Sequence, residues 1–160
     1  MSEIFLTKSA VMLFLFRENG IEQEILLQKR FNTGYLDGMW DCSASGHVEE
    51  NESMKMALLR ESKEEINIDI ELKNIHFATI MHKYTPTSGN TYYNGYFFVK
   101  LYNGTPIINE PQKCSDLCWF NLKELPKDFI PDRQKALNNY LSNIPYDELG
   151  WDSFCRARHP

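Results

Sequence analysis

Three glutamates near the middle of the chain are the residues whose type and spacing best suit chemistry. Glu61, Glu64 and Glu65 fall in a run without Gly or Pro, Ser53 to Ile66, and on a helix at 100° per residue they share about a third of the circumference. Each like-charge pair at i,i+3 or i,i+4 costs about 0.2–0.5 kcal/mol. The cluster becomes useful when a divalent cation lies among its oxygens, since magnesium prefers carboxylate and water ligands. Taken alone, the run equally describes a solvated surface on which Arg60 pairs with Glu64.

The wider segment decides between these interpretations. Residues 46–68, GHVEENESMKMALLRESKEEINI, resemble the Nudix box, Gly-x5-Glu-x7-Arg-Glu-U-x-Glu-Glu-x-Gly-U, in which U is a bulky apolar residue. The positions that match in register are Gly46, Glu52, Arg60, Glu61, Glu64, Glu65 and Ile68.

Two positions depart from the box pattern. Asn67 replaces Gly, and we expect the turn to survive because Asn tolerates the left-handed conformation. Ser62 replaces an apolar residue and predicts looser packing under the helix. The approach at 37–40 and the late segment 119–126 also resemble the family, so the resemblance extends over nearly the whole chain.

The resemblance implies a hydrolase that cleaves the diphosphate of a nucleotide-type substrate with Mg²⁺, or alternatively Mn²⁺. The implied catalytic residues are Glu61, Glu64 and Glu65. The implied metal ligands are these three glutamates, the backbone carbonyl of Ser45 or Gly46, and the late-loop carboxylate Glu110. The metal would polarise phosphoryl oxygens and lower the pKa of a bound water.

The general base and the structural residues follow from the same resemblance. Either a box glutamate, Glu61, or a later carboxylate acts as the base; Glu110 is the favoured late candidate and Asp116 the weaker one, and both are equally consistent with plain surface. Arg60 and Glu52 are expected to tie the helix to its preceding loop by a salt bridge.

Residues outside the box supply the candidates for substrate binding. Arg30 ends an apolar strand at a position suited to a phosphate contact. Phe31, Tyr35 and Tyr92 are candidates for stacking on a base, although aromatic residues in a small β-rich domain more often belong to the core. Tyr84 and Tyr93 are further candidates for stacking on a base. Neither His47 nor His82 is expected to be catalytic.

The expected fold class is α/β: a Nudix fold, an α/β/α sandwich with a central mixed β-sheet, formed by one domain over residues 1–160. Helices are expected at 53–66 and 131–141, with Ser53 as N-cap and Pro131 in the first turn. The expected strands are 9–16, 24–29, 40–44, 75–83, 92–101 and 117–120, with a loop at 31–39. No strong periodicity follows Pro145.

Composition bounds the partners and the compartment. The net charge is −5, with scattered basic residues, which argues against a stable nucleic-acid complex. The longest apolar run, 10–16, is too short for a bilayer and carries no signal-peptide features, so a cytoplasmic protein without membrane partners is expected. The cysteines are expected to be reduced and mostly buried: Cys42, Cys114, Cys118 and Cys155.

Two other functions share this resemblance. An isopentenyl-diphosphate isomerase needs a cysteine just before the Gly-His pair, where this chain has Ser45, and Cys42 lies three residues too early. A non-catalytic binding module usually loses box carboxylates, and this chain keeps them. Within hydrolysis, the short chain favours a nucleoside triphosphate, ordinary or oxidised, with release of pyrophosphate; ADP-ribose or a nucleotide sugar is the runner-up. A monomer or homodimer is expected.

Overall fold

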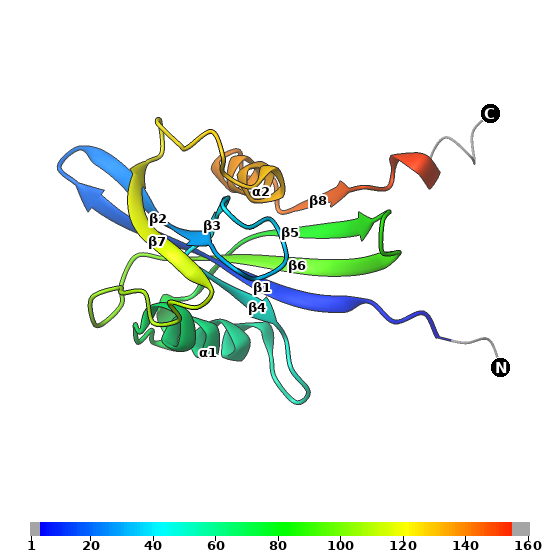
Figure 1. The fold of residues 1–160 in the computed structure, drawn as a ribbon, viewed down its shortest axis with the longest axis horizontal. Coiled ribbons are helices and arrows are strands. Elements are labelled where there is room, and N and C mark those ends of the chain that lie inside the picture. Colours follow the sequence, from blue (N-terminus) through cyan, green and yellow to red (C-terminus); the bar gives the residue numbers. More distant parts are fainter. Residues whose placement is uncertain (1–3, 155–160) are drawn as a thin grey trace.

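The computed structural model describes residues 4–154 as one mixed sheet with two long helices (Figure 1). The strands are β1 (Lys8–Asn19), β2 (Glu22–Arg30), β3 (Trp40–Cys42), β4 (Ala44–His47), β5 (His76–Thr85), β6 (Asn90–Val99), β7 (Cys114–Asn121) and β8 (Tyr146–Leu149). The helices are α1 (Met54–Ile66), α2 (Pro131–Leu141) and a short 3-10 turn, η1 (Leu72–Asn74).

The sheet combines parallel and antiparallel pairs, as expected from the sequence. Its main path is β3-β2-β1-β6-β5-β8, with β4 paired to β1 and β7 paired to β2. The pairs β1–β6 and β5–β8 are parallel, and the remaining ladders are antiparallel.

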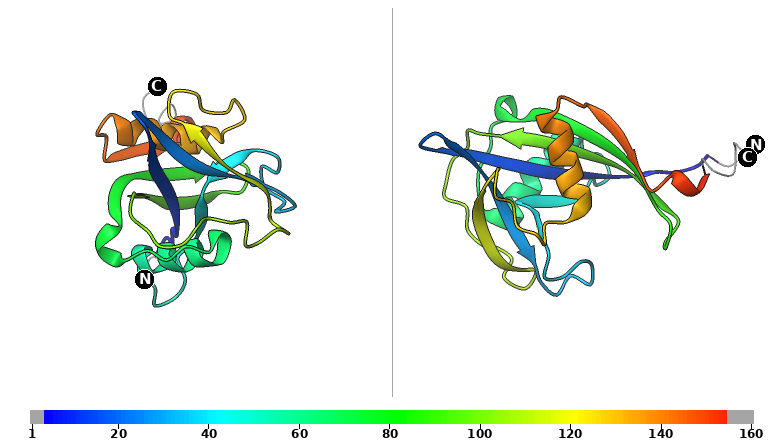
Figure 2. Two further views of the ribbon diagram at one scale, coloured as in Figure 1. Left: turned by 90° about the vertical axis from the view of Figure 1, so that its left-hand side faces the viewer. Right: turned by 90° about the horizontal axis from the view of Figure 1, so that it is seen from above.

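The two helices cover opposite faces of this sheet (Figures 1 and 2). Beneath α2, a cluster of buried side chains includes Phe14, Phe16 and Tyr96. Beneath α1, a second cluster includes Leu13, Leu15 and Val99. Alternate residues of β1 therefore serve opposite cores, which explains why this strand is an unbroken apolar run. The expected Nudix fold, a mixed sheet flanked by helices, is confirmed.

Strand β1 changes its partner part-way along its length. From Leu15 to Asn19 it pairs with β2, whereas from Ala10 to Leu13 it pairs with β4. The second half of β2 pairs with β3 instead of β1, while β7 pairs with β2 from Glu24 to Arg30. The sheet therefore divides into two branches, one ending in β4 and the other in β2 and β3.

Helix α1 has the ends that its sequence predicts. The Ser53 side chain accepts a hydrogen bond from Met56 N, and Asn67 ends the helix in the left-handed conformation, with φ 54°. Ser62, the apolar position of the box, is fully buried, and its hydroxyl donates to Leu58 O at 2.6 Å. Its polar group is thus satisfied within the helix. Helix α2 also has its expected bounds, with proline in its first turn.

Two features of the sheet differ from the expectation. The segment 40–44, expected as one strand, is divided at Ser43 because β3 pairs with β2 and β4 pairs with β1. The buried Ser43 hydroxyl donates to Leu13 O at 3.1 Å at this division. Strand β8 was not expected; its four residues are held by parallel pairing with β5.

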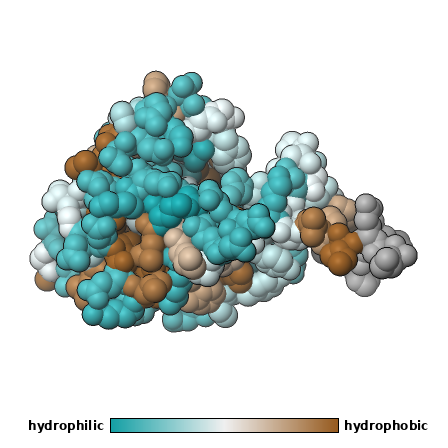
Figure 3. All heavy atoms as spheres, turned by 90° about the horizontal axis from the view of Figure 1, so that it is seen from below, coloured by the Kyte–Doolittle hydropathy of each residue, from teal (hydrophilic) through white to brown (hydrophobic). Residues whose placement is uncertain are grey.

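The surface seen from the α1 side is largely hydrophilic, with one hydrophobic patch at the lower left of the main body and another group at the protruding right-hand end (Figure 3). Among the residues that the structure describes, no helix is long and apolar enough to be a candidate membrane span. Cys42 and Cys114 are buried free thiols and Cys118 is a half-buried one, while Cys155 lies outside the described residues.

Candidate active site

Glu65, in the last turn of α1, is the most deeply placed carboxylate of the box. Its Oε2 accepts hydrogen bonds from Ser45 N at 2.8 Å and from Gln28 Nε2 at 3.0 Å. Burial and, to a smaller extent, the nearby Glu61 charge raise the pKa of Glu65, both hydrogen bonds lower it, and the net result is a pKa of about 8. These contacts fix the carboxyl group between helix α1, β4 and β2.

Glu61 packs directly against the backbone of β4 at Gly46. A Cβ atom at position 46 would collide with the Glu61 carboxyl group, so only glycine leaves room for it. Burial raises the pKa of Glu61, and the charges of Glu64 and Glu110 act in the same direction, while Arg60 opposes them. The invariant first position of the box pattern therefore has a direct steric reason here.

Arg60 joins the box helix to the loop before it, as the sequence predicts. Its Nε and Nη2 donate to the two Glu52 oxygens at 2.9 and 3.0 Å, and Nη2 also donates to His47 O at 3.0 Å. Its Nη1 contacts Glu61 at 2.6 Å and Glu64 at 3.4 Å. The guanidinium group thus holds both the loop and two of the three candidate ligands.

The donor set fits a hard divalent cation, although its oxygens do not converge on one point. Within residues 4–154, no group of three His, Cys, Asp or Glu side chains is gathered closely enough to hold a metal. The reason is local: Arg60 draws Glu61 and Glu64, while Ser45 N and Gln28 hold Glu65. The charge of Glu64 raises the pKa of Glu61, and the charge of Glu61 raises the pKa of Glu65. Such closely spaced carboxylates supply the oxygen ligands that magnesium prefers.

The two late carboxylates occupy different surroundings. Glu110 pairs with Lys113 at 2.9 Å and lies close enough to Glu61 for its charge to raise the pKa of that residue. Asp116 lies within β7 rather than in a loop, and its Oδ1 accepts from Leu117 N at 2.8 Å. Of the two, Glu110 is the one beside the box.

A cavity of about 560 Å³ opens where the two branches of the sheet separate. Its wall includes six of the residues proposed from the sequence: Arg30, Tyr35, Ser45, Gly46, Glu65 and Tyr92. Phe31 does not contribute to the wall and is 51% exposed. The cavity is thus continuous with the box through Ser45, Gly46 and Glu65.

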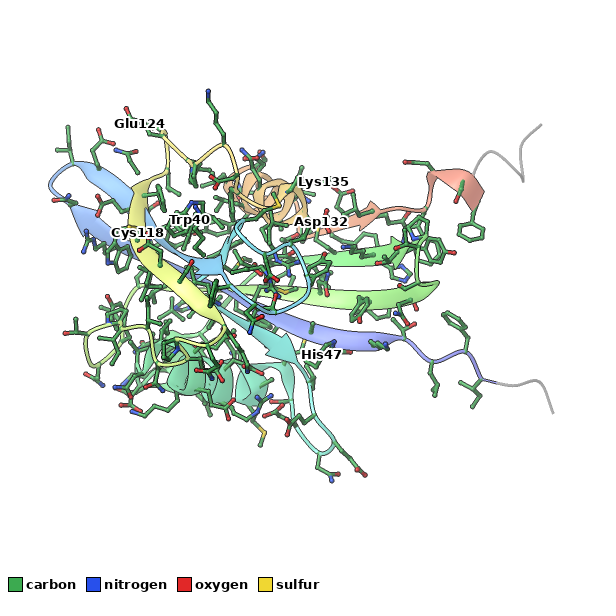
Figure 4. The ribbon with its side chains drawn as sticks, viewed as in Figure 1. Trp40, His47, Cys118, Glu124, Asp132 and Lys135 are labelled. Atoms are coloured by element: carbon green, nitrogen blue, oxygen red, sulfur yellow. The ribbon has the colours of Figure 1, made fainter. Side chains whose placement is uncertain are left out.

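The predicted substrate-binding residues carry contacts of their own. The Arg30 guanidinium donates to Asp41 Oδ2 at 2.8 Å and to Tyr35 O at 2.6 Å, and it lies 5.4 Å from the centre of the Tyr35 ring. Tyr92 lies beside His47, with ring centres 5.8 Å apart. Figure 4 shows His47 at the end of β4. Two aromatic surfaces, Tyr35 and Tyr92, therefore belong to the cavity wall.

Tyr84, Tyr93 and His82 lie away from the cavity wall. His82 stacks on Tyr93 with ring centres 4.4 Å apart and also contacts Trp151 at 4.6 Å. Tyr84 packs against Trp151 and Phe154. These rings link β5 and β6 to the end of the described chain, and they are not part of the cavity wall.

Several polar residues of the cavity wall were not predicted from the sequence: Gln28, Lys83, Asn94, Lys113 and Arg133. Gln28 and Asn94 are buried although they lie on strands among apolar and aromatic neighbours. A buried polar residue in such a strand is itself a signal of a partner or a site. That signal was present in the sequence at Gln28 and at Asp41, the latter between Trp40 and Cys42.

A larger concavity, about 1050 Å³, lies at the other end of β1, beside Arg17 and Lys100. It contains no box residue, and its charges of both signs include the paired Lys73 and Glu71. The candidate active site is therefore the smaller cavity, whose wall contains the box residues Gly46 and Glu65.

Comparison with known proteins identifies the family of this chain. The NUDIX domain model matches residues 6–140. The chain is 30% identical to the uncharacterized Nudix hydrolase YfcD of Escherichia coli, over 78% of this chain and 68% of that protein. It is 28% identical to isopentenyl-diphosphate Delta-isomerase 2 of Aromatoleum aromaticum, over 74% of this chain but 61% of the isomerase, so it spans less than two thirds of that relative.

Solved structures show the same fold. A MutT NUDIX hydrolase from Burkholderia pseudomallei superposes with a TM-score of 0.74 at 23% identity, covering 84% of this chain and 98% of that one. The NUDIX domain of Shewanella oneidensis NrtR, solved with ADP ribose, gives a TM-score of 0.70 at 16% identity, covering 88% and 90%. With the family model matching most of its length, this chain belongs to the Nudix hydrolase family, whose members act on phosphoanhydride bonds.

Proposed function

We propose that this protein hydrolyses a nucleoside triphosphate, ordinary or oxidised, to the monophosphate and pyrophosphate, with Mg²⁺ or Mn²⁺ as cofactor. The observation that carries the proposal is the position of Glu61 and Glu65. Both carboxyl groups lie against the Ser45–Gly46 segment of β4, and Glu65 forms part of the cavity wall. Glu64 follows on the same helix at the edge of the group.

The chain's own residues prepare this position. Ser45 N and Gln28 orient Glu65, Gly46 gives Glu61 room, and Arg60 restrains Glu61 and Glu64 until they are needed as ligands. A cation held by the three glutamates would polarise the phosphoryl oxygens and activate the attacking water. Glu61 and Glu110 are the two candidates for the residue that accepts the water proton. Glu110 lies close enough to Glu61 for its charge to raise the pKa of Glu61.

The substrate end of the cavity supports a nucleotide. Tyr35 and Tyr92 offer ring surfaces for a base, and Arg30 offers a guanidinium for a phosphate. The second candidate substrate is ADP-ribose or a nucleotide sugar. Hydroxyl and amide side chains in the wall favour it, since they suit sugar hydroxyls: Thr85, Thr87, Ser88, Asn90 and Asn94. The related fold solved with ADP ribose is consistent with this second candidate.

The isomerase alternative fits the geometry less well. Cys42 is fully buried in the cluster beneath α2, and burial raises the pKa of its thiol well above the usual value. It does not belong to the cavity wall. A protonated, enclosed thiol is a poor acid–base group.

The test is a turnover screen of the purified chain with Mg²⁺ and then Mn²⁺. The panel contains ordinary and oxidised nucleoside triphosphates, ADP-ribose, nucleotide sugars, dinucleoside polyphosphates and isopentenyl diphosphate, with products separated by ion exchange. Monophosphate and pyrophosphate from a triphosphate are the expected products. Turnover of ADP-ribose alone would show that ADP-ribose, and not a triphosphate, is the substrate. Isomerisation of isopentenyl diphosphate without any hydrolysis would overturn the proposal.

A further inference from the structure

The cavity wall contains two arginines that share one buried carboxylate. Asp41 is fully buried on β3, and its Oδ2 accepts from Arg30 Nη1 at 2.8 Å, while its Oδ1 accepts from Arg133 Nε at 2.8 Å. Arg133 comes from α2 and also donates from Nη1 to Tyr96 Oη at 3.3 Å. Both arginines contribute to the cavity wall.

Two cations of this group share the charge of one buried carboxylate, Asp41, and the exposed Asp37 lies close enough to Arg30 for the Arg30 charge to lower the pKa of Asp37. Burial alone would raise the pKa of Asp41, but Arg133 and Arg30 outweigh it and hold the pKa below its ordinary value, so the residue is ionised. Two guanidinium groups therefore face a single carboxylate. The other cations of the wall are paired one to one: Lys83 with Asp132, and Lys113 with Glu110.

Arg133 lines the cavity and has Asp41 as its one carboxylate ion-pair partner among the described residues. Its side chain is only 9% exposed, so it is not an ordinary surface arginine. Within residues 4–154, its Nε and Nη1 have acceptors, and no hydrogen bond from Nη2 is found. A buried cation with an open donor at a cavity wall is a strong attraction for an anion, because low local polarity strengthens the interaction.

The arginine pair lies next to the box rather than at a remote surface. Gln28, which binds Glu65, precedes Arg30 by two positions on β2, a strand length of about 7 Å. Asp41 is opposite Gln28 in the β2–β3 ladder, and its charge acts on Glu65. An anion held at the box and another held by the arginines would thus be neighbouring groups of one small molecule.

We propose that Arg133, together with Arg30, binds an anionic group of the substrate beyond the diphosphate held at the box, a third phosphate or a carboxylate, and so determines specificity. The inference rests on the proposed function for the place of the diphosphate. It deepens that function by requiring a substrate with a further negative group beyond the diphosphate, which a triphosphate has and a nucleotide sugar with an uncharged sugar lacks.

The test measures binding by calorimetry to the full chain with Mg²⁺. The probes are methylenediphosphonate and its three-phosphorus homologue bis(phosphonomethyl)phosphinate, whose P–C–P links are not hydrolysed. The wild type should prefer the longer compound, and Arg133→Gln should weaken that compound's binding by about tenfold while changing the shorter one little. The matched control, Lys135→Gln, removes the same charge from the same helix outside the cavity wall and should keep the preference (Figure 4).

The outcomes separate this inference from the proposed function. Binding of the shorter compound tests the diphosphate site, and the preference for the longer one tests Arg133. A wild type without that preference, or a folded Arg133→Gln variant that keeps it, would overturn the inference; binding of neither compound would overturn both. If Arg133→Gln does not fold, Arg133→Lys takes its place; binding of the longer compound should still weaken because one ammonium group cannot bridge Asp41 and a phosphate, but the loss should be smaller because the positive charge is retained.

Discussion

The carboxyl group of Glu65 is buried and receives hydrogen bonds from two neutral donors, Ser45 N and Gln28. Its pKa is raised to about 8, chiefly by burial, so without a cation the folded protein favours the protonated form at neutral pH. A divalent cation would reverse this preference, because it supplies the charge that burial removes. Binding of a metal at this site is therefore expected to release the Glu65 proton.

This residue makes the stability of the metal-free protein depend on pH. The folded pKa lies above the ordinary value of 4.5, so Glu65 destabilises the fold progressively as pH rises from about 4.5 to 8. Glu65→Gln keeps a hydrogen-bond acceptor without the charge. Its advantage over the wild type in urea unfolding with a chelator should therefore be small at pH 5 and larger at pH 9 by about 4 kcal/mol.

A matched variant separates burial from net charge in that experiment. Glu124→Gln removes an exposed glutamate beyond β7 and should leave the pH dependence unchanged (Figure 4). An equal gap between Glu65→Gln and wild type at both pH values would show that the Glu65 carboxyl group is not perturbed in the folded chain.

Gly46 offers a second test at the level of one residue. A methyl group there would meet only the Glu61 side chain, which is flexible, so Gly46→Ala should fold but displace the carboxyl group. Metal-dependent turnover should fall at least tenfold, while the midpoint of thermal unfolding changes by only a few degrees. Normal turnover by a folded Gly46→Ala protein would mean that the position of Glu61 is unimportant.

The spacing of residues in the sequence predicts the positions of the box residues, but it does not predict which residues form the cavity wall. Glu61, Glu64 and Glu65 lie on one helix, where sequence distance determines direction. Gln28, Asp41 and Arg133 meet only because β2, β3 and α2 pack together. The sequence marks such residues only as polar positions among apolar ones, without naming their partners.

At the scale of elements, the end of α1 depends on a left-handed residue. Asn67 has φ 54°, and its N–H donates to Lys63 O at 3.2 Å. Asn67→Gly, which restores the family pattern, should leave the free energy of unfolding equal or higher, whereas Asn67→Ala should lower it by about 1 kcal/mol. Urea unfolding of the two variants checks this, and equal stabilities would contradict the role of the backbone conformation.

The elements differ in how far they could be predicted. Both helices were found because caps, a first-turn proline and the absence of internal Gly mark their bounds. Strand β8, with the sequence YDEL, has no such pattern and exists because β5 provides a parallel edge. The division of 40–44 into β3 and β4 also depends on which strand each half meets, which is a property of the whole sheet.

At the scale of the whole molecule, Asp41 joins two strands to the helix across the sheet. Its ion pairs with Arg30 and Arg133 connect β3, β2 and α2. Asp41→Asn would leave Arg133 buried without its counter-charge and should destabilise the fold by about 3–5 kcal/mol at pH 7.

The pH dependence distinguishes this pair from simple packing. Because the folded pKa of Asp41 is lowered, its stabilisation is present above the ordinary value of 3.8 and is lost as pH falls through the folded value. The gap in unfolding free energy between wild type and Asp41→Asn should therefore be full at pH 7 and shrink below about pH 4. A gap that stays constant down to pH 2 would exclude the charge as its source.

The divided sheet is what brings these parts into one site. Because β1 leaves β2 for β4, the cavity opens between a branch that carries Ser45 and Gly46 and a branch that carries Gln28 and Arg30, and Glu65 of α1 contacts both branches through Ser45 N and Gln28. We infer that the box glutamates at this opening hold the catalytic cation.

The most direct test is the magnesium-dependent turnover of Glu64→Gln, compared with wild type and Glu124→Gln on the same substrate panel. The Glu64 side chain is 53% exposed and its only ion pair is the 3.4 Å contact with Arg60 among the described residues, so its loss should not disturb the fold. We predict turnover lower by several orders of magnitude, with unchanged circular dichroism and a control equal to wild type. Near-normal turnover by folded Glu64→Gln would contradict the claim.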